Sequence, residues 1–340
     1  MKTSIVILNY NGADCLQKFI PILMEKTVLE ETEIIVADNG STDNSLETLI
    51  HFPSIRVIKL DKNYGFAEGY NKALAEVKSD YYVLLNSDIE VTDNWLEPLV
   101  GFLESNPEYA ACQPKIRSYR NRNYFEHAGA AGGFIDKYGF PFCRGRIFAD
   151  IEEDNGQYDT NLDVFWATGA CMLVRGNLFH ETGGLDGGFF AHMEEIDLCW
   201  RLRNRGYKLA CVPESKIYHV GGATLDYKNP FKVYLNFRNS LLMLYKNLSA
   251  KDIRKIMFIR YFFDYVAAFQ MLLKGEWKNF KMVVKARRDY KKMRPDYIVK
   301  RKENLSKTTV DFIPEILQKS LVVEYFLKGK KTYNSLMKEK

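Results

Sequence analysis

A short polar run, Asn86-Ser87-Asp88, directly follows five mainly apolar residues, Tyr81–Leu85. The apolar run predicts a strand that is buried on both faces. In an open α/β sheet, ligands bind at the carboxyl ends of the strands. A carboxylate held there can bind a divalent cation, and the cation can bind a phosphate. Because Asn-Ser-Asp is also typical of a polar turn that ends a strand, the interpretation depends on the rest of the chain.

An acid and a histidine occupy comparable places elsewhere in the chain. Asp38 follows the strand-like run 33–37, and His219 lies two residues before Gly221 and Gly222 at the end of another strand-like run. A carboxylate from Asp88 and an imidazole from His219 would suit Mg²⁺ or Mn²⁺ with a phosphate-bearing ligand. Asp38 is equally a turn residue and His219 a hydrogen-bonded structural histidine. The repetition of the pattern favours a site.

Three acids, Glu194, Glu195 and Asp197, lie within four residues where a loop is predicted to become a helix. Acids at a helix start stabilise the helix dipole, which is their structural alternative. Three exceed that need, so we expect Glu195 to face the crevice and to act as a general base for a hydroxyl.

The elements that must position these residues alternate along the first part of the chain. Strands are predicted near 4–8, 33–37, 55–60 and 81–85, with helices near 14–24, from 44, from 66 to 77, and over 93–103. This alternation indicates βαβ units and a mostly parallel sheet. Further strands are predicted at 164–174, interrupted by Gly169, at 208–212 and at 216–222, and a helix is predicted to end at Gly206. The stretch 113–163 is predicted to form meander strands and loops over the site.

The character of the chain changes near residue 225, where long helical stretches (231–248 and 253–273) replace the alternation. We therefore expect one domain over 1–224 and a basic helical extension over 225–340. The first part has 21 Lys and Arg against 32 Asp and Glu, and the second has 27 against 11. Two parts of opposite charge suggest two roles.

The basic extension has two interpretations: an amphipathic surface against anionic lipid, which we favour, or a solvated helical hairpin or oligomer contact. No nucleic-acid-binding module accompanies the charge, so we expect no nucleic-acid partner. The stretch 253–273 carries Arg260 and Asp264 and is a poor transmembrane span. The six cysteines show no metal-ligand spacing, and no signal peptide is evident, so a cytoplasmic location, with peripheral attachment to the inner membrane surface, is expected.

Several of these motifs, taken together and in order, resemble family 2 glycosyltransferases, and most closely their rhamnosyltransferase-like branch. The resemblance covers roughly residues 3–245. It rests on the segments 4–12, 36–43, 63–67, 85–88, 194–199 and 218–222. It implies the GT-A fold, an α/β Rossmann-like mixed sheet flanked by helices. It also implies a nucleotide-sugar donor (UDP- or dTDP-linked), a divalent cation (Mn²⁺ or Mg²⁺) and inversion at the anomeric carbon.

Carried over residue by residue, the resemblance assigns roles to the motif positions. Asp88 matches the last acid of the DxD metal motif, His219 a histidine that can complete the metal site, and Glu195 the catalytic base. Asp38 matches the residue that contacts the nucleotide base. The implied donor-binding residues are Asn9, Asp38, Asn39, Gly65, Asn86 and Asp88. Two positions depart from the pattern: Asn86 replaces the first acid of DxD, and Glu195 stands where Asp is usual.

The acceptor would be a glycan or a lipid-linked glycan in cell-surface polysaccharide synthesis, and rhamnose is one candidate for the transferred sugar. We expect Trp166, Glu194 and Asp197 to bind the acceptor, although core packing is the alternative for Trp166. Two other functions stay open. A sugar nucleotidyltransferase would need a glycine-rich basic phosphate loop, which Asn9–Gly12 is not. A non-catalytic glycan- or lipid-binding protein on a degenerate scaffold would not need Asp88, Glu195 and His219.

Overall fold

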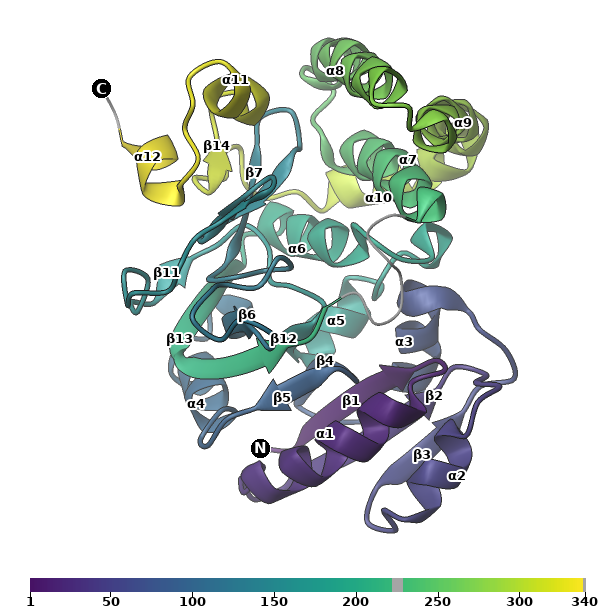
Figure 1. Ribbon diagram of the computed structural model, residues 1–340, viewed down its shortest axis with the longest axis vertical. Helices are drawn as coiled ribbons and strands as arrows, with labels where there is room; N and C mark the ends of the chain where they lie inside the picture. Colours follow the sequence, from purple (N-terminus) through teal and green to yellow (C-terminus); the bar gives the residue numbers. More distant parts are fainter. Residues whose placement is uncertain (222–228, 339–340) are drawn as a thin grey trace.

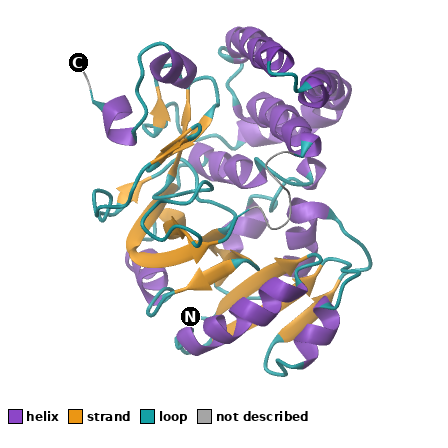
Figure 2. Ribbon diagram, in the orientation of Figure 1, coloured by secondary structure: helices purple, strands orange, loops and turns teal. Residues whose placement is uncertain are grey.

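The computed structural model describes residues 1–221 and 229–338. Its centre is a mixed sheet with the strand order β11-β13-β6-β12-β4-β1-β2-β3, and β5 pairs with β13. Helices cover both faces of this sheet, and a group of helices from the C-terminal part stands at one end (Figures 1 and 2). Gly222 and the expected boundary at 224/225 lie outside the described residues.

The four predicted N-terminal strands form the parallel part of the sheet, which confirms the βαβ pattern. The strands are β1 (Thr3–Asn9), β2 (Thr32–Asp38), β3 (Arg56–Lys59) and β4 (Tyr81–Asn86). The helices between them are α1 (Ala13–Lys26), α2 (Ser45–Ile50) and α3 (Gly65–Ala75). Strand β1 lies between β2 and β4 and is parallel to both. The apolar residues of β1 and β4 are buried, apart from the half-buried Leu8, as their continuous runs predict.

The second half of the sheet contains antiparallel pairs. It consists of β5 (Ile89–Val91), β6 (Tyr109–Ser118), β11 (Leu162–Asp163), β12 (Cys171–Arg175) and β13 (Lys208–His219). Strand β12 is antiparallel to both β4 and β6, whereas β13 is parallel to β6. The packed helices here are α4 (Glu97–Ser105), α5 (Gly176–Glu181) and α6 (Glu194–Asn204).

Two strand predictions were wrong in extent. The strand predicted over 164–174 is interrupted at Gly169, as expected, but it forms only after that point, since β12 begins at Cys171. The chain turns at Gly169 and Ala170, where the Ala170 amide donates to Thr168 Oγ1. The two strands predicted at 208–212 and 216–222 are one strand, β13, whose pairing with β6 shifts between Val212 and Lys216. Such an irregularity bends a strand without ending it.

The region 113–163 contains strands, as predicted, and most of them belong to a second sheet of order β10-β9-β8-β7-β14. Its strands are β7 (Gly133–Asp136), β8 (Pro141–Cys143), β9 (Arg146–Ile147), β10 (Asp150–Ile151) and β14 (Ile316–Leu317). Strand β14 comes from the C-terminal part and pairs with β7. Helices α11 (Leu321–Phe326) and α12 (Tyr333–Met337) follow it beside this sheet (Figure 1).

The long helices predicted after residue 225 are present. They are α7 (Pro230–Asn247), α8 (Ile253–Leu273), α9 (Trp277–Met293) and α10 (Tyr297–Ser306). Helix α7 packs on α6, α9 and α10, and α8 packs on α7 and α9. Among the C-terminal helices, α7 therefore stacks on the helix that carries Glu194 and Glu195.

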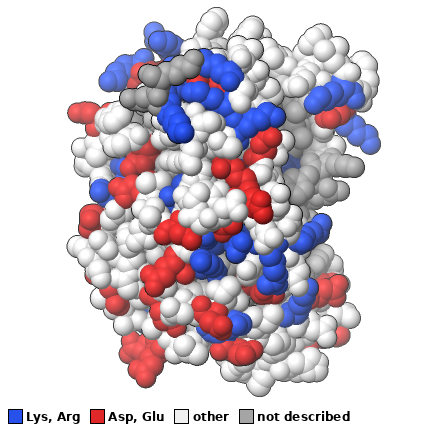
Figure 3. Space-filling model, turned by 60° about the vertical axis from the view of Figure 1, so that its left-hand side comes forward, with Lys and Arg blue, Asp and Glu red and all other residues white. Residues whose placement is uncertain are grey.

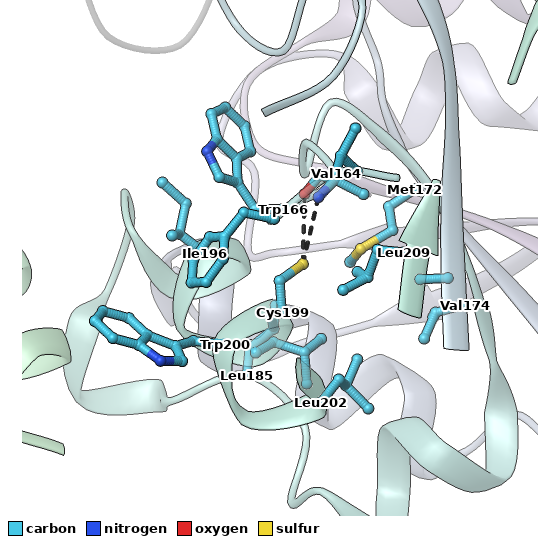
Figure 4. Packing of buried hydrophobic residues seen from close by; sticks show 14 of the residues in the cluster. Val164, Trp166, Met172, Val174, Leu185, Ile196, Cys199, Trp200, Leu202 and Leu209 are labelled. Carbon is cyan, nitrogen blue, oxygen red and sulfur yellow. Dashed lines mark hydrogen bonds between the residues drawn. The ribbon is translucent and has the colours of Figure 1, made fainter. Parts of the chain in front are cut away.

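The core beneath α6 is built from apolar side chains of distant segments. Cys199, on the buried face of α6, packs among Trp166, Met172 and Leu209, and Ala167 hydrogen-bonds its sulfur (Figure 4). Gly206 has φ of +88° just after the helix, a conformation that glycine adopts without strain, and it ends α6 as predicted. This packing fixes the start of α6 relative to the sheet.

Candidate active site

The carboxyl ends of the parallel strands meet at one edge of the sheet and carry the predicted site residues. Asn9, at the end of β1, pairs in register with Asp38 at the end of β2, and Leu8 pairs with Asn86 at the end of β4. A Cβ atom added at Gly12 would meet the side chains of both Asn9 and Ser87. The turns after β1 and β4 are therefore in contact.

Asp38 and Asn9 form a buried polar pair. Asp38 Oδ2 accepts a hydrogen bond from the Ser41 amide at 3.1 Å, and Asp38 Oδ1 accepts one from Asn9 Nδ2 at 3.3 Å. Asn9 Oδ1 is buried, and no described residue donates a hydrogen bond to it. A buried acceptor without a partner suits a ligand that supplies a donor there, such as the ring N–H of a nucleotide base.

Asn39 fixes the turn that leads into α3. Its Nδ2 donates to the Gly65 carbonyl oxygen at 3.0 Å, and its Oδ1 accepts from the Tyr64 amide at 3.0 Å. The amide is fully used within the protein, so its contribution to a donor pocket is to shape the turn. Gly65 has φ of +77°, and an added Cβ would collide with the ring of Phe190. Only glycine fits this close approach.

The turn at Gly65 also touches the loop that precedes α6. The amides of Phe66 and Ala67 both donate to the Phe190 carbonyl oxygen, at 2.6 and 3.1 Å. This loop is conformationally unusual, since Phe190, His192 and Met193 all have positive φ values. Three non-glycine residues with positive φ within four positions are costly and occur where a fold over-determines them, most often at functional sites.

The predicted metal residues are in direct contact. His219 Nε2 lies 3.1 Å from Asp88 Oδ1 and 3.4 Å from Asn86 Nδ2. The Gly221 amide donates to Asp88 Oδ2 at 3.2 Å. On the other side of the ring, His219 Nδ1 lies 3.3 Å from Glu126 Oε2. Asp88, His219 and Glu126 thus form a row of carboxylate, imidazole and carboxylate.

The charges in this row perturb the histidine. Burial by itself would lower the pKa of His219, but the two carboxylates outweigh it and raise the pKa to about 10. The imidazole is therefore protonated at neutral pH unless a cation takes the place of the proton. A histidine that binds a metal through one nitrogen and donates to a carboxylate through the other is a common arrangement.

The donor set fits a hard divalent cation that retains other ligands. Within residues 1–221 and 229–338, no group of three or more His, Cys, Asp or Glu side chains could hold a metal. Asp88 and His219 can supply one oxygen and one nitrogen. Mg²⁺ and similar ions at phosphate sites are commonly held by one or two protein ligands, with water and phosphate oxygens filling the remaining positions.

The predicted base lies at the same edge. The Asn86 amide donates to the Ala170 carbonyl oxygen at 2.9 Å, and a Cβ added at the adjacent Gly169 would lie 3.7 Å from Glu195 Cβ. Glu195 is partly exposed, whereas its Oε2 atom is buried and accepts no hydrogen bond from the described residues. Burial raises the pKa of Glu195 to about 7. A carboxylate of this kind is poised to accept a proton near neutral pH.

Glu194 and Asp197 are less accessible than Glu195. Glu194 is 4% exposed, and burial, with a further contribution from the Glu195 charge, raises its pKa well above the usual range. Asp197 is 0% exposed, and its oxygens accept from Arg201 Nε, Asn247 Nδ2 and Lys246 Nζ. Asp197 is therefore placed as a structural anion, out of reach of an acceptor in this conformation.

Trp166 also lies inside the protein. It is 4% exposed, its Nε1 donates to the Phe134 carbonyl oxygen at 2.9 Å, and its ring packs against Gly133. These contacts correspond to the core-packing alternative. The hollow between Met1, Leu29, Glu97 and Glu104 lies at the opposite edge of the sheet, next to the beginnings of β1 and β2, and brings together none of the predicted site residues.

Two site-shaping residues were missed from the sequence. Glu126 lies in the region 113–163, to which no chemistry was assigned. Asn239 lies inside α7 and donates through Nδ2 to the carbonyl oxygens of Phe189, Ala191 and His192, at 2.9, 2.9 and 2.8 Å. No local motif marks either residue, because each acts on a segment far away in the chain.

Comparison with known proteins shows the family of the chain. The model of the glycosyl transferase family 2 matches residues 4–183. The chain is 24% identical over 231 residues to an N-acetylglucosaminyl-diphospho-decaprenol L-rhamnosyltransferase of Mycobacterium tuberculosis, covering 63% of this chain and 75% of that one. It is 28% identical over 222 residues to the rhamnosyltransferase WbbL of Escherichia coli, covering 63% and 82%.

A solved structure shares the fold. The crystal structure of GalNAc-T7 with UDP, GalNAc and Mn²⁺ aligns with a TM-score of 0.58 at 17% identity, over 72% of this chain and 48% of that chain. This chain therefore spans about half the length of that protein. The mixed sheet flanked by helices is the GT-A fold. On the match over residues 4–183, the chain belongs to glycosyl transferase family 2.

Proposed function

We propose that this glycosyltransferase moves a sugar from a nucleoside-diphosphate donor to a hydroxyl of a glycan or lipid-linked glycan, with inversion, during cell-surface polysaccharide synthesis. The observation that carries the proposal is Glu195. Its carboxylate has a buried, unpaired oxygen and a pKa raised to about 7, and its segment reaches the sheet edge that holds Asp88 and His219. The rhamnosyltransferases among the relatives support a deoxyhexose donor, UDP- or dTDP-linked, such as a rhamnosyl nucleotide.

The donor is proposed to lie across the ends of β1, β2 and β4. Asp38 and Asn9 bind the nucleotide base, and Asn39 and Gly65 shape the turn beside it. Asn86 and Asp88 face the diphosphate. The fully protein-bound amide of Asn39 supports an indirect role, since both ends of that side chain already hold the turn.

Asp88 and His219 would hold a divalent cation, with Mn²⁺ and Mg²⁺ as the candidates. When bound, such an ion stabilises the negative charge that develops on the leaving diphosphate. The neighbour crystallised with UDP and Mn²⁺ supports this assignment. Glu126 orients His219 through Nδ1, and the Gly221 amide holds Asp88 in place.

Glu195 is proposed to be the base of the transfer. Its carboxylate accepts the proton of the acceptor hydroxyl while the hydroxyl oxygen forms a bond to the anomeric carbon. The bond from that carbon to the diphosphate oxygen breaks on the opposite face, which inverts the configuration. Glu194 is less exposed than Glu195, and burial raises the pKa of its carboxyl, so Glu195 is the more accessible of the two acids.

The acceptor is proposed to be presented at a membrane. The name of the mycobacterial relative contains a lipid-linked acceptor, N-acetylglucosaminyl-diphospho-decaprenol. The basic C-terminal helices of this chain suit the cytoplasmic face of an anionic membrane. The enzyme would then be a peripheral protein of the inner membrane surface.

The test combines nucleotide binding with one substitution. Thermal unfolding is measured with UDP, dTDP, GDP, ADP and CDP, with and without Mn²⁺, on the wild type and on Glu195→Gln. A ligand that binds only the folded state raises the melting temperature. We expect a Mn²⁺-dependent increase with one or two nucleotides in both proteins, and loss of sugar transfer, by about 10²–10⁴-fold, only in Glu195→Gln. A folded wild type that responds to no nucleotide would overturn the proposal. If Glu195→Gln transferred sugar as fast as the wild type, Glu195 would not be the catalytic base.

A further inference from the structure

Helix α8 buries an ion pair among partly buried apolar residues, such as Ile256 and Met257, and exposes a row of large apolar side chains. Arg260 and Asp264, one turn apart, face the protein interior and form an ion pair at 3.3 Å, and Arg287 of α9 also pairs with Asp264. Arg260 Nη1 donates to the Tyr138 carbonyl oxygen at 3.1 Å. A helix on the surface of a water-soluble domain normally has the opposite arrangement.

The exposed face of α8 is a continuous apolar stripe. It consists of Phe258, Phe262, Val266, Phe269 and Leu273, which follow one another at spacings of four, four, three and four residues. Phe258 is 77% exposed and Leu273 is 73% exposed. We call these five residues the outer stripe. Large apolar patches of this kind mark interaction sites, because water does not stabilise them.

Basic side chains surround the outer stripe. Exposed Arg254 and Lys255 lie at its beginning and Lys274 at its end. The following helix, α9, exposes a basic face that contains Lys278, Lys281, Arg288, Lys291 and Lys292. In Figure 3, the uppermost part of the molecule, at the height of α8 in Figure 1, is largely free of charged atoms, and Lys and Arg groups lie beside it.

We propose that the outer stripe lies in the interfacial layer of an anionic bilayer, with α8 parallel to the membrane plane and the basic face of α9 against the lipid headgroups. An apolar helix face beside Lys and Arg is the pattern of such interfacial helices. This inference rests on the membrane location proposed above and identifies the surface responsible for it.

Two other occupants fit the structure less well. A second copy of this chain would bring the same basic groups together, and their repulsion opposes a symmetric contact. Helix α8 is long and apolar enough to cross a membrane by length and composition. A spanning orientation would expose its ionic face to lipid, whereas that face is held by Arg287 and by the Tyr138 carbonyl oxygen.

Trp277 provides a direct readout at the end of α8. It is 61% exposed, at the first residue of α9, whereas the other three tryptophans, Trp95, Trp166 and Trp200, are buried. The full chain is mixed with vesicles of phosphatidylcholine alone, or of phosphatidylcholine and phosphatidylglycerol in equal parts, and tested by flotation and tryptophan emission. We expect flotation and a blue shift with the anionic vesicles, and weaker binding at high salt.

The variant that tests the surface is Phe258→Ser/Phe262→Ser/Phe269→Ser. The matched control is Val28→Ser/Ile50→Ser, which changes two apolar residues of comparable exposure outside the C-terminal helices. We expect the triple variant to bind anionic vesicles about tenfold or more weakly, and the control to bind like the wild type. Nucleotide-dependent thermal stabilisation, measured in parallel, shows that each variant is folded and reports on the donor site independently of lipid.

Three results would overturn the inference: no binding of the wild type to anionic vesicles, equal binding of the triple variant, or equal binding to neutral vesicles. A wild-type dimer that becomes a monomer only in the triple variant, without lipid binding, would assign the stripe to a contact between copies. Lipid binding without any nucleotide response would support this surface while contradicting the proposed transferase site.

Discussion

Asn239 Nδ2 lies 2.8 Å from the carbonyl oxygen of His192, two residues before the helix that carries Glu194 and Glu195. The same nitrogen also donates to the carbonyl oxygens of Phe189 and Ala191. A C-terminal helix thus holds the strained loop that leads to the proposed base. The C-terminal helices and the sheet domain are therefore joined at the candidate site and not only along the chain.

Asn239→Ala is expected to lower both stability and turnover. The substitution removes the Asn239 donor from the carbonyl oxygens of Ala191 and His192, whereas that of Phe189 still accepts from Arg238. Loss of these bonds costs about 1–3 kcal/mol in the free energy of unfolding. Misplacement of Glu195 should reduce kcat by about tenfold or more, with a smaller change in donor binding. The measurements are urea unfolding and steady-state kinetics.

The control for Asn239 is Asn236→Ala in the same helix. Asn236 Nδ2 donates to the Lys232 carbonyl oxygen one turn earlier, and no bond from its side chain to the loop is present among the described contacts. We expect nearly normal turnover from this variant. Equal loss of kcat in both would show that α7 is merely destabilised and that the loop contacts have no special role.

Glu126→Gln is expected to weaken the proposed metal site without removing a ligand. The carboxylate lies 3.3 Å from His219 Nδ1 and fixes the ring that would present Nε2 to the cation. Loss of such an outer partner typically costs about 10–100-fold in metal affinity. Titration of Mn²⁺ in the presence of UDP, followed by thermal stabilisation, measures this change directly.

Glu90→Gln is the matched control for Glu126. Glu90 is an acid close to His219, because it lies opposite Tyr218 in the pairing of β5 with β13. Its carboxylate pairs with the exposed Arg122. Its substitution should leave the Mn²⁺ response unchanged. An unaltered Mn²⁺ response in Glu126→Gln would mean that the row of Asp88, His219 and Glu126 is purely structural.

Lys246→Met is expected to be strongly destabilising. Lys246 Nζ lies 2.7 Å from Asp186 Oδ2 and 2.7 Å from Asp197 Oδ2, and all three side chains are at most 5% exposed. Removal of this cation leaves Asp197 with Arg201 and Asp186 with the half-exposed Lys300 as their remaining cations. The loss of one of two cations from each of two buried carboxylates should cost about 3 kcal/mol in the free energy of unfolding. Chemical denaturation monitored by circular dichroism measures this loss.

Lys300→Met tests whether the burial of Lys246 is the reason for the large loss of stability expected from Lys246→Met. Lys300 Nζ is also 2.7 Å from Asp186, but its side chain is 48% exposed. An ion pair with one solvated partner contributes about 1 kcal/mol or less. Similar losses from Lys246→Met and Lys300→Met would contradict the assignment of Lys246 as the cation that joins α7 to α6.

The strand ends of the site could be predicted because their signals are local. Apolar runs that end in Asn9, Asp38 or Asn86 indicate buried parallel strands, and parallel strands place their ends at one edge. The burial of Asp197 could not be predicted in this way. Its partner Asn247 lies 50 residues away, and nothing within α6 distinguishes a buried acid from an acceptor-binding one.

The strands and site contacts of 113–163 and of the C-terminal part were also hard to predict, because they depend on partners far away in the sequence. Strand β14 has two residues and exists only because it pairs with β7. The apolar character of α8 was evident in the sequence, but its inverted polarity was not. That arrangement depends on Arg287 from the next helix, which pairs with Asp264 inside the protein.

The pH dependence of the transfer should follow Glu195. Because burial raises the pKa of this carboxyl to about 7 and the base must be ionised, kcat/KM is expected to fall about tenfold per pH unit below about 7 and to level off above it.

The contribution of Glu195 to stability depends on pH in the opposite direction. An unfolded Glu titrates near about 4.3, so the folded state takes up protons more readily, and the contribution of Glu195 to stability is full below that value and lost as the pH rises through about 7. Glu195→Gln, which cannot ionise, should therefore match the wild type in stability at acidic pH and exceed it at alkaline pH. The measurement is the free energy of unfolding of both proteins as a function of pH. If the two proteins show the same dependence on pH, Glu195 has an ordinary pKa and is not a base adjusted to neutral pH.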